Sequence, residues 1–107
     1  MTNPNLLSAE SHFAFGKNWL DYAQKIDEAK IAQAIADLQR LSGRQRFDGL
    51  SFLDIGCGSG LHSLAAVRMG AARVVGVDID ADSVAAARGT LKRFAPEADA
   101  RFDRSEE

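Results

Sequence analysis

The feature that most constrains this chain is a glycine-rich turn between an apolar segment and a helical pattern. Residues 51–55 are mostly apolar, and they run directly into Gly56, Gly58 and Gly60. A second apolar segment follows and ends at Asp78, eighteen residues after Gly60. This layout predicts a nucleotide-cofactor site at the carboxyl ends of parallel strands in a doubly wound α/β domain.

The apolar spacing along the rest of the chain predicts alternating helices and strands. We expect helices over residues 18–25, 28–42, 60–69 and 81–94, and strands over residues 51–55, 73–78 and, as the beginning of a third, 98–102. The strand segments are nearly continuous apolar runs, so they are predicted to be buried on both faces. The helix over 28–42 has one predicted buried stripe: Ile31, Ala34, Ile35, Leu38 and Leu41.

Composition excludes several classes of protein. The formal net charge is -2, so no basic field points to nucleic acid, and no apolar run reaches the roughly 20 residues of a membrane span. A single cysteine excludes an internal disulfide, and together these features favour a soluble, cytoplasmic protein. We expect residues 1–48 to form an N-terminal helical segment and residues 49–107 to form part of a Rossmann-like domain.

Each glycine of the turn has an expected role. Gly56 permits a sharp exit from the strand, Gly58 removes a side chain from the cofactor surface, and Gly60 lets the next helix start against the strand. Free N–H groups at that helix start suit a carboxylate of the ligand. Asp78 is expected to accept hydrogen bonds from ribose hydroxyls, which places Ile79 near the adenine.

Two further residues of this region leave alternatives open. Asp54 interrupts an apolar strand, and it is expected either to help organise the cofactor or to accept hydrogen bonds from loop N–H groups. Cys57 is either a nucleophile activated by the helix start or a small residue where space is tight, and we favour the second reading. One cysteine and two distant histidines, His12 and His62, argue against a metal site.

The segment Phe13–Trp19 is unusually aromatic for a polar N-terminal region. Its side chains either fold over the cofactor as a lid or pack on the first helices, and packing is the favoured reading.

The sequence Leu53-Asp54-Ile55-Gly56-Cys57-Gly58-Ser59-Gly60 resembles motif I of the class I S-adenosylmethionine-dependent methyltransferases. Residues 75–80 are similar to the acidic second-strand motif of the same family. The resemblance implies a transferase with S-adenosyl-L-methionine as cofactor. The binding residues it implies are Asp54, Gly56, Cys57, Gly58, Ser59, Gly60, Asp78 and Ile79. No catalytic residue is predicted, and the methyl acceptor is unknown.

A complete doubly wound sheet has about five or more strands, and this chain supplies two or three. We therefore expect a fragment, the N-terminal portion of a methyltransferase, with self-association through an exposed sheet edge. One alternative is an NAD(P)-binding oxidoreductase fragment, although the third glycine of that fingerprint would fall at Leu61. Another alternative is a non-catalytic binding or interaction module.

Overall fold

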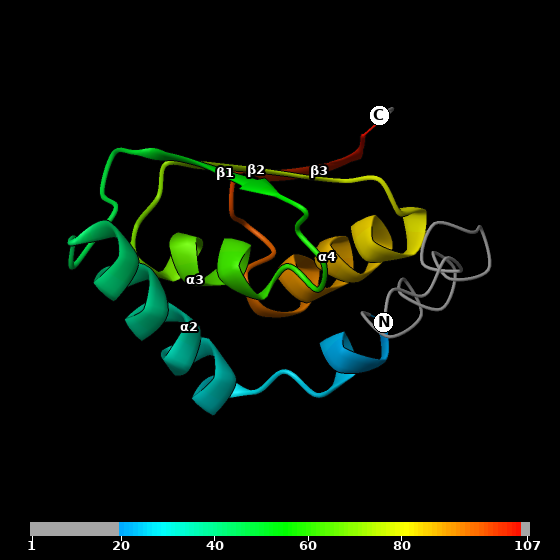
Figure 1. The fold of residues 1–107 in the computed structure, drawn as a ribbon, viewed down its shortest axis with the longest axis horizontal. Coiled ribbons are helices and arrows are strands. Elements are labelled where there is room, and N and C mark those ends of the chain that lie inside the picture. The colour runs from blue at the N-terminus through cyan, green and yellow to red at the C-terminus, as the bar shows by residue number, and fades with distance from the viewer. Residues whose placement is uncertain (1–19, 106–107) are drawn as a thin grey trace, which may run out of the picture.

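The computed structural model describes residues 20–105, and a three-stranded parallel sheet forms its centre (Figure 1). The strands lie in the order β1-β2-β3, and their bounds are β1 Ser51–Ile55, β2 Arg73–Asp78 and β3 Ala100–Arg104. One helix connects each pair of consecutive strands. The predicted α/β class is confirmed as a partial Rossmann-like sheet, and the first two strands have the predicted bounds.

The third strand runs further than the sequence pattern indicates. The prediction stops at Phe102 and treats Asp103–Glu107 as a charged end, whereas β3 continues to Arg104. The reason is backbone pairing, because β3 follows β2 to its end and Arg104 lies opposite Asp78. Charged side chains at 101, 103 and 104 do not interrupt a strand whose partner continues.

Three helices have the ends that the sequence predicts within about one residue. They are α2 Glu28–Ser42, α3 Leu61–Arg68 and α4 Ala81–Phe94, and residues 20–24 are also helical. Asp27 and Asp80 cap α2 and α4, because their side chains accept hydrogen bonds from nearby backbone N–H groups. Gly43 ends α2 with a φ of 72°. Among residues 20–105, no helix is both long and apolar enough to cross a membrane.

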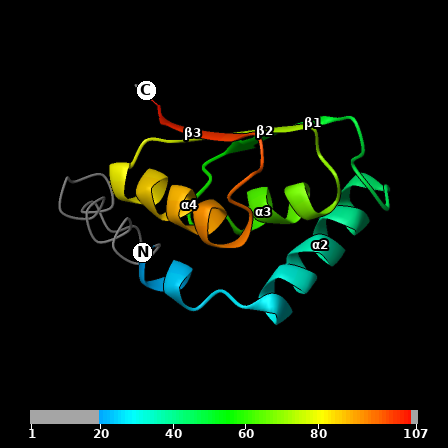
Figure 2. The same ribbon diagram turned by 180° about the vertical axis from the view of Figure 1, so that it is seen from behind.

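All described helices lie on one side of the sheet, as Figure 1 and the reverse view in Figure 2 show. α3 and α4 pack directly on the strands, and α2 packs on α3. The predicted burial of the strands on both faces is therefore wrong. Leu53 is 61% exposed and Ile55 is 78% exposed, because no described element covers the opposite face.

The core lies between the sheet and the α3–α4 layer. Leu64, Val74 and Ala87 are fully buried there, and the Phe102 ring fills the space opposite Gly76. A side chain at Gly76 would collide with that ring, so this glycine makes room for an aromatic on the neighbouring strand. In α2 the predicted stripe is buried at Ile31 and Ala34 and partly buried at Ile35 and Leu38, whereas Leu41 is 78% exposed.

The division of the chain into an N-terminal helical segment (residues 1–48) and part of a Rossmann-like domain (residues 49–107) stays a prediction.

Candidate functional site

The glycine turn after β1 folds back onto β2. Gly56, Gly58 and Gly60 have φ angles of 74°, 53° and 81°, which side chains other than glycine rarely tolerate. The backbone N–H groups of Gly56 and Cys57 both donate to the carbonyl oxygen of Val77, at 2.8 and 3.0 Å. The turn is thus fixed to the carboxyl end of the second strand.

Gly60 and Gly56 differ in the space available for a side chain. A Cβ at Gly60 would lie 2.8 Å from the Cα of Ala87, so the close packing is between the turn and α4, not between α3 and the strand as predicted. A Cβ at Gly56 would meet nothing within 4 Å. Gly60 therefore serves helix packing, whereas Gly56 leaves open space.

A cavity of 430 Å³ adjoins the turn. It combines the turn with the start of α3 and one side chain from the N-terminal helical residues, and its lining residues are Tyr22, Asp54, Gly56, Cys57, Ser59, Leu61 and His62. Four of the eight predicted binding residues line this cavity: Asp54, Gly56, Cys57 and Ser59.

Asp54 is held by a partner that the sequence reasoning does not name. The hydroxyl of Ser63, which is fully buried in α3, donates to Oδ2 of Asp54 at 2.7 Å. Among residues 20–105, Oδ1 of Asp54 has no hydrogen-bond partner. The carboxylate is thus fixed in orientation by α3, with one oxygen available to a ligand.

Asp78 binds the turn itself. Its Oδ2 accepts a hydrogen bond from the N–H of Gly58 at 3.2 Å, and its Oδ1 accepts one from the N–H of Asp80 at 3.0 Å. Because an ionised carboxylate offers about four acceptor positions, room remains for two hydroxyl donors. Asp78 does not line the 430 Å³ cavity, and the adjacent Ile79 is 49% exposed.

Cys57 is not an activated nucleophile. Its side chain is buried, and burial raises the pKa of the thiol to about 12, with the nearby carboxylates of Asp78 and Asp54 acting in the same direction. A thiol with such a pKa stays protonated near neutral pH. The favoured reading of Cys57 as a small packing residue agrees with its place in the core.

The N–H groups at the start of α3 are only partly free. Leu61 donates to the hydroxyl of Ser59 at 3.3 Å, and Gly60 donates to the carbonyl of Cys57 at 2.8 Å. In the described part of the chain, the N–H groups of Ser59, His62 and Ser63 have no acceptor. The expected donors for a ligand carboxylate are thus fewer than predicted, and two of them belong to cavity-lining residues.

Comparison of the sequence with models of known families identifies the family to which this glycine turn and its carboxylates belong. The model of the family described as ribosomal protein L11 methyltransferase (PrmA) matches residues 32–102, which include the turn, both site carboxylates and β3 up to Phe102. The chain belongs to this family. The sequence resemblance to methyltransferases is thereby confirmed.

Relatives in the L11 methyltransferase family are longer proteins. The ribosomal protein L11 methyltransferase of Xanthomonas campestris pv. campestris is 46% identical over 61 residues, covering 57% of this chain and 20% of that protein. The enzyme of the same description from Pectobacterium carotovorum is 43% identical over 56 residues, covering 52% and 19%. The chain thus spans about a fifth of the length of the curated relatives it matches.

Solved structures support the fold of this L11 methyltransferase family member. Magnesium protoporphyrin IX methyltransferase from Synechocystis PCC 6803, whose structure contains bound SAH, aligns with a TM-score of 0.56 at 21% identity over 98% of this chain and 42% of that chain. A putative RNA methyltransferase from Pyrococcus horikoshii aligns with a TM-score of 0.53 at 22% identity over 69% of this chain and 35% of that chain.

Sequence reasoning missed several residues of the site in this family member. Tyr22 reaches the cavity from residues that precede the turn by more than thirty positions, and no local pattern indicates that contact. Leu61 and His62 directly follow Gly60. Their place in the first turn of the predicted helix could therefore have indicated that they line the site. The aromatic segment Phe13–Trp19, expected to pack on the first helices or, alternatively, to cover the cofactor as a lid, lies outside the described residues.

Proposed function

We propose that this chain carries the S-adenosyl-L-methionine-binding part of a methyltransferase. The observation that supports the proposal most strongly is the cavity at the glycine turn, where the Asp54 carboxylate is oriented by Ser63. When bound, S-adenosyl-L-methionine supplies a methyl group on a positively charged sulfur, which a nucleophile can attack. The family match supports the same reaction class.

The residues present fit such a ligand. The open space beside Gly56 admits a group that a side chain would exclude, and the free Oδ1 of Asp54 suits the ammonium group of an amino acid. The unpaired N–H groups of Ser59 and His62 suit its carboxylate. We assign the ribose hydroxyls to Asp78 and the adenine to the surface at Ile79.

These residues bind and orient, and none of them is placed as a catalytic base. Transfer of a methyl group depends on holding the acceptor in line with the methyl donor. The relatives are named for ribosomal protein L11, so we propose that protein as the methyl acceptor of the full-length enzyme, which would act in the cytoplasm. We expect residues 1–107 alone to bind the cofactor weakly and to show no turnover.

Titration calorimetry with S-adenosyl-L-methionine, S-adenosylhomocysteine and NAD tests the binding proposal on this chain. We expect heat of binding from the two sulfur-containing ligands and none from NAD. Binding of NAD alone would instead support the oxidoreductase alternative. Absence of binding by all three ligands, with a defined protein partner, would support the interaction-module alternative.

We also propose that the 107-residue chain associates with itself through the uncovered sheet face and the free edge of β1. Leu53 and Ile55 are large apolar side chains exposed on that face, with Val75 and Val77 beside them on β2. Contiguous exposed apolar surface of this kind favours association. Among residues 20–105 no strand pairs with the outer edge of β1, and that edge offers backbone groups for pairing.

A further inference from the structure

Tyr22 is the one aromatic side chain among the described residues that line the cavity at the glycine turn. It reaches this cavity from the helical residues 20–24, which lie apart from the sheet in Figure 1. The other lining residues belong to the end of β1, the turn and the start of α3. Tyr22 is therefore a wall of the proposed cofactor site that a separate part of the chain supplies.

Packing on the core fixes the position of Tyr22. Its side chain is partly buried and packs against the core cluster that contains Cys57 and Leu64. Ile26, which follows the helical residues, belongs to the same cluster and is 2% exposed. The carbonyl of Tyr22 also accepts a hydrogen bond from the N–H of Lys25 at 2.9 Å. The tyrosine ring is thus held at the cavity by residues on both sides of the chain turn.

The cavity has the charge that a cationic ligand requires. Asp54 is the one carboxylate among its described lining residues, and none of those residues is a lysine or an arginine. Cys57 adds no charge near neutral pH, because burial raises the pKa of its thiol to about 12. A cavity lined by charge of one sign concentrates ligands of the opposite sign.

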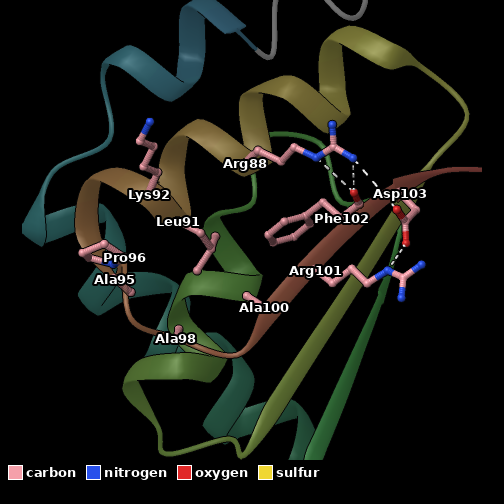
Figure 3. A pocket seen from close by; sticks show the side chains of 10 residues that line it. All are labelled: Arg88, Leu91, Lys92, Ala95, Pro96, Ala98, Ala100, Arg101, Phe102 and Asp103. Carbon is pink, nitrogen blue, oxygen red and sulfur yellow. Dashed lines mark hydrogen bonds and ion pairs between the residues drawn. The ribbon is translucent and has the colours of Figure 1, made fainter.

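The groove between α4 and β3 has the opposite charge pattern. Its volume is 380 Å³, and three of its lining side chains are cationic: Arg88, Lys92 and Arg101 (Figure 3). They share one carboxylate, that of Asp103, which lies 2.6 Å from Arg101 Nε and 3.9 Å from Arg88 Nη2. Of these two hollows, the cavity at the glycine turn is the one suited to a cation.

The proposed cofactor carries two positively charged groups, an ammonium and a sulfonium. Asp54 is assigned to the ammonium, and Asp78 already accepts hydrogen bonds from Gly58 and Asp80. A sulfonium has no N–H or O–H group, so it cannot donate a hydrogen bond to either carboxylate. The face of an aromatic ring attracts such cations, as it attracts quaternary ammonium ligands.

We propose that the ring of Tyr22 contacts the sulfonium of S-adenosyl-L-methionine and makes the site prefer this methyl donor to S-adenosylhomocysteine. The inference rests on the proposed function, because it concerns the same cavity. S-adenosylhomocysteine has the same adenosine and amino acid groups but a neutral sulfur, so it lacks the attraction to the ring. Tyr22 is thus a specificity-determining residue that favours binding of the donor and release of the demethylated product.

Titration calorimetry of the 107-residue chain with both ligands tests the proposal through the ratio of their dissociation constants. Tyr22→Phe keeps an aromatic ring and should keep the preference for S-adenosyl-L-methionine. Tyr22→Leu keeps an apolar side chain without a ring, and it should reduce that preference about three- to thirtyfold. Phe94→Leu is the matched control, because Phe94 packs on the same core cluster but does not line this cavity.

NMR of the wild type gives a second measurement that does not depend on a variant. Tyr22 is the only tyrosine of the chain, so its ring signals are assigned without ambiguity. We expect a transferred NOE between its ring protons and the S-methyl protons of the bound donor.

The outcomes separate this inference from the proposed function. An unchanged ratio of dissociation constants in Tyr22→Leu, or binding without the NOE, would overturn the role of Tyr22 and leave the proposed function standing. An equal loss of preference in Tyr22→Phe would assign the effect to the hydroxyl group and would also overturn it. Absence of binding of both ligands to the wild type would refute the proposed function and this inference together.

Discussion

The carboxylate of Asp78, at the end of β2, accepts a hydrogen bond from the backbone N–H of Gly58, twenty residues earlier in the chain, at 3.2 Å. The same carboxylate accepts a bond from the N–H of Asp80, next to the start of α4. One side chain thus joins the glycine turn, the second strand and the following helix. These bonds fix the position of the carboxylate that we propose for ribose binding, and they also hold the turn in place.

Asp78→Ala is therefore expected to weaken both cofactor binding and the fold. Loss of hydrogen bonds to a charged acceptor costs about 1.5–3 kcal/mol, or about ten- to a hundredfold in the dissociation constant. Calorimetry with S-adenosylhomocysteine measures the first effect and thermal unfolding the second. The control is Asp99→Ala, which removes an exposed carboxylate from the opposite end of the sheet. Unchanged affinity in folded Asp78→Ala would refute the ribose assignment.

Comparison of Gly56→Ala with Gly43→Ala separates the loss of protein stability from the loss of cofactor affinity. Gly56 and Gly43 have φ angles of 74° and 72°, and a Cβ at either position meets no atom within 4 Å. Alanine at either position should thus destabilise the protein by about 1–2 kcal/mol. Only Gly56→Ala is expected to weaken cofactor binding, by about tenfold or more, because its Cβ enters the space assigned to the ligand. Equal affinities of the two variants would make Gly56 a structural turn residue only.

The raised pKa of Cys57 predicts a loss of stability at high pH. An ordinary thiol ionises near pH 8.5, whereas burial raises the pKa of this thiol to about 12. Above pH 8.5 the unfolded chain releases the proton and the folded chain keeps it. The free energy of unfolding is therefore unaffected by this thiol below pH 8.5. Between pH 8.5 and pH 12 it falls by about 1.4 kcal/mol per pH unit.

Urea unfolding of the wild type and of Cys57→Ala at pH 8 and pH 10 isolates this effect, because all other titrating groups are shared. The wild type should lose more stability between the two pH values than the variant. Iodoacetamide should also react slowly with the folded protein at pH 8 and rapidly after unfolding. Rapid alkylation of the folded chain would show that the Cys57 thiol is not buried and that its pKa is not raised.

Ile55→Lys is expected to reduce self-association of the 107-residue chain. Ile55 is 78% exposed on the uncovered face of the sheet, and a charged side chain there opposes apolar contact between copies. Leu41 is also 78% exposed but lies on α2, on the helical side, so Leu41→Lys is a matched control. Sedimentation velocity over a range of concentrations should show smaller species for Ile55→Lys alone. The same distribution of sedimentation coefficients for the wild type, Ile55→Lys and Leu41→Lys would show that any self-association does not use the sheet face at Ile55.

The local elements of this chain follow directly from its sequence. Asp27 and Asp80 begin helices and Gly43 ends one, because capping needs only a side chain or a conformation at the right position. Apolar runs bounded by polar residues marked β1 and β2 at their observed ends. The spacing of Gly56, Gly58 and Gly60 indicated the family, since backbone turns of this shape require glycine at particular positions.

Tertiary structure alone decided which faces are covered and which distant residues meet. A nearly continuous apolar run cannot show that every described helix lies on one side of the sheet, so the strands were predicted to be buried on both faces although Leu53 and Ile55 are exposed. The bond from Ser63 to Asp54, the contact of Gly60 with Ala87 and the place of Tyr22 in the cavity all depend on the packing of separate elements. Sequence fixes the conformation of neighbouring residues because their interactions are local, whereas burial and site geometry depend on contacts between elements that are distant in the chain.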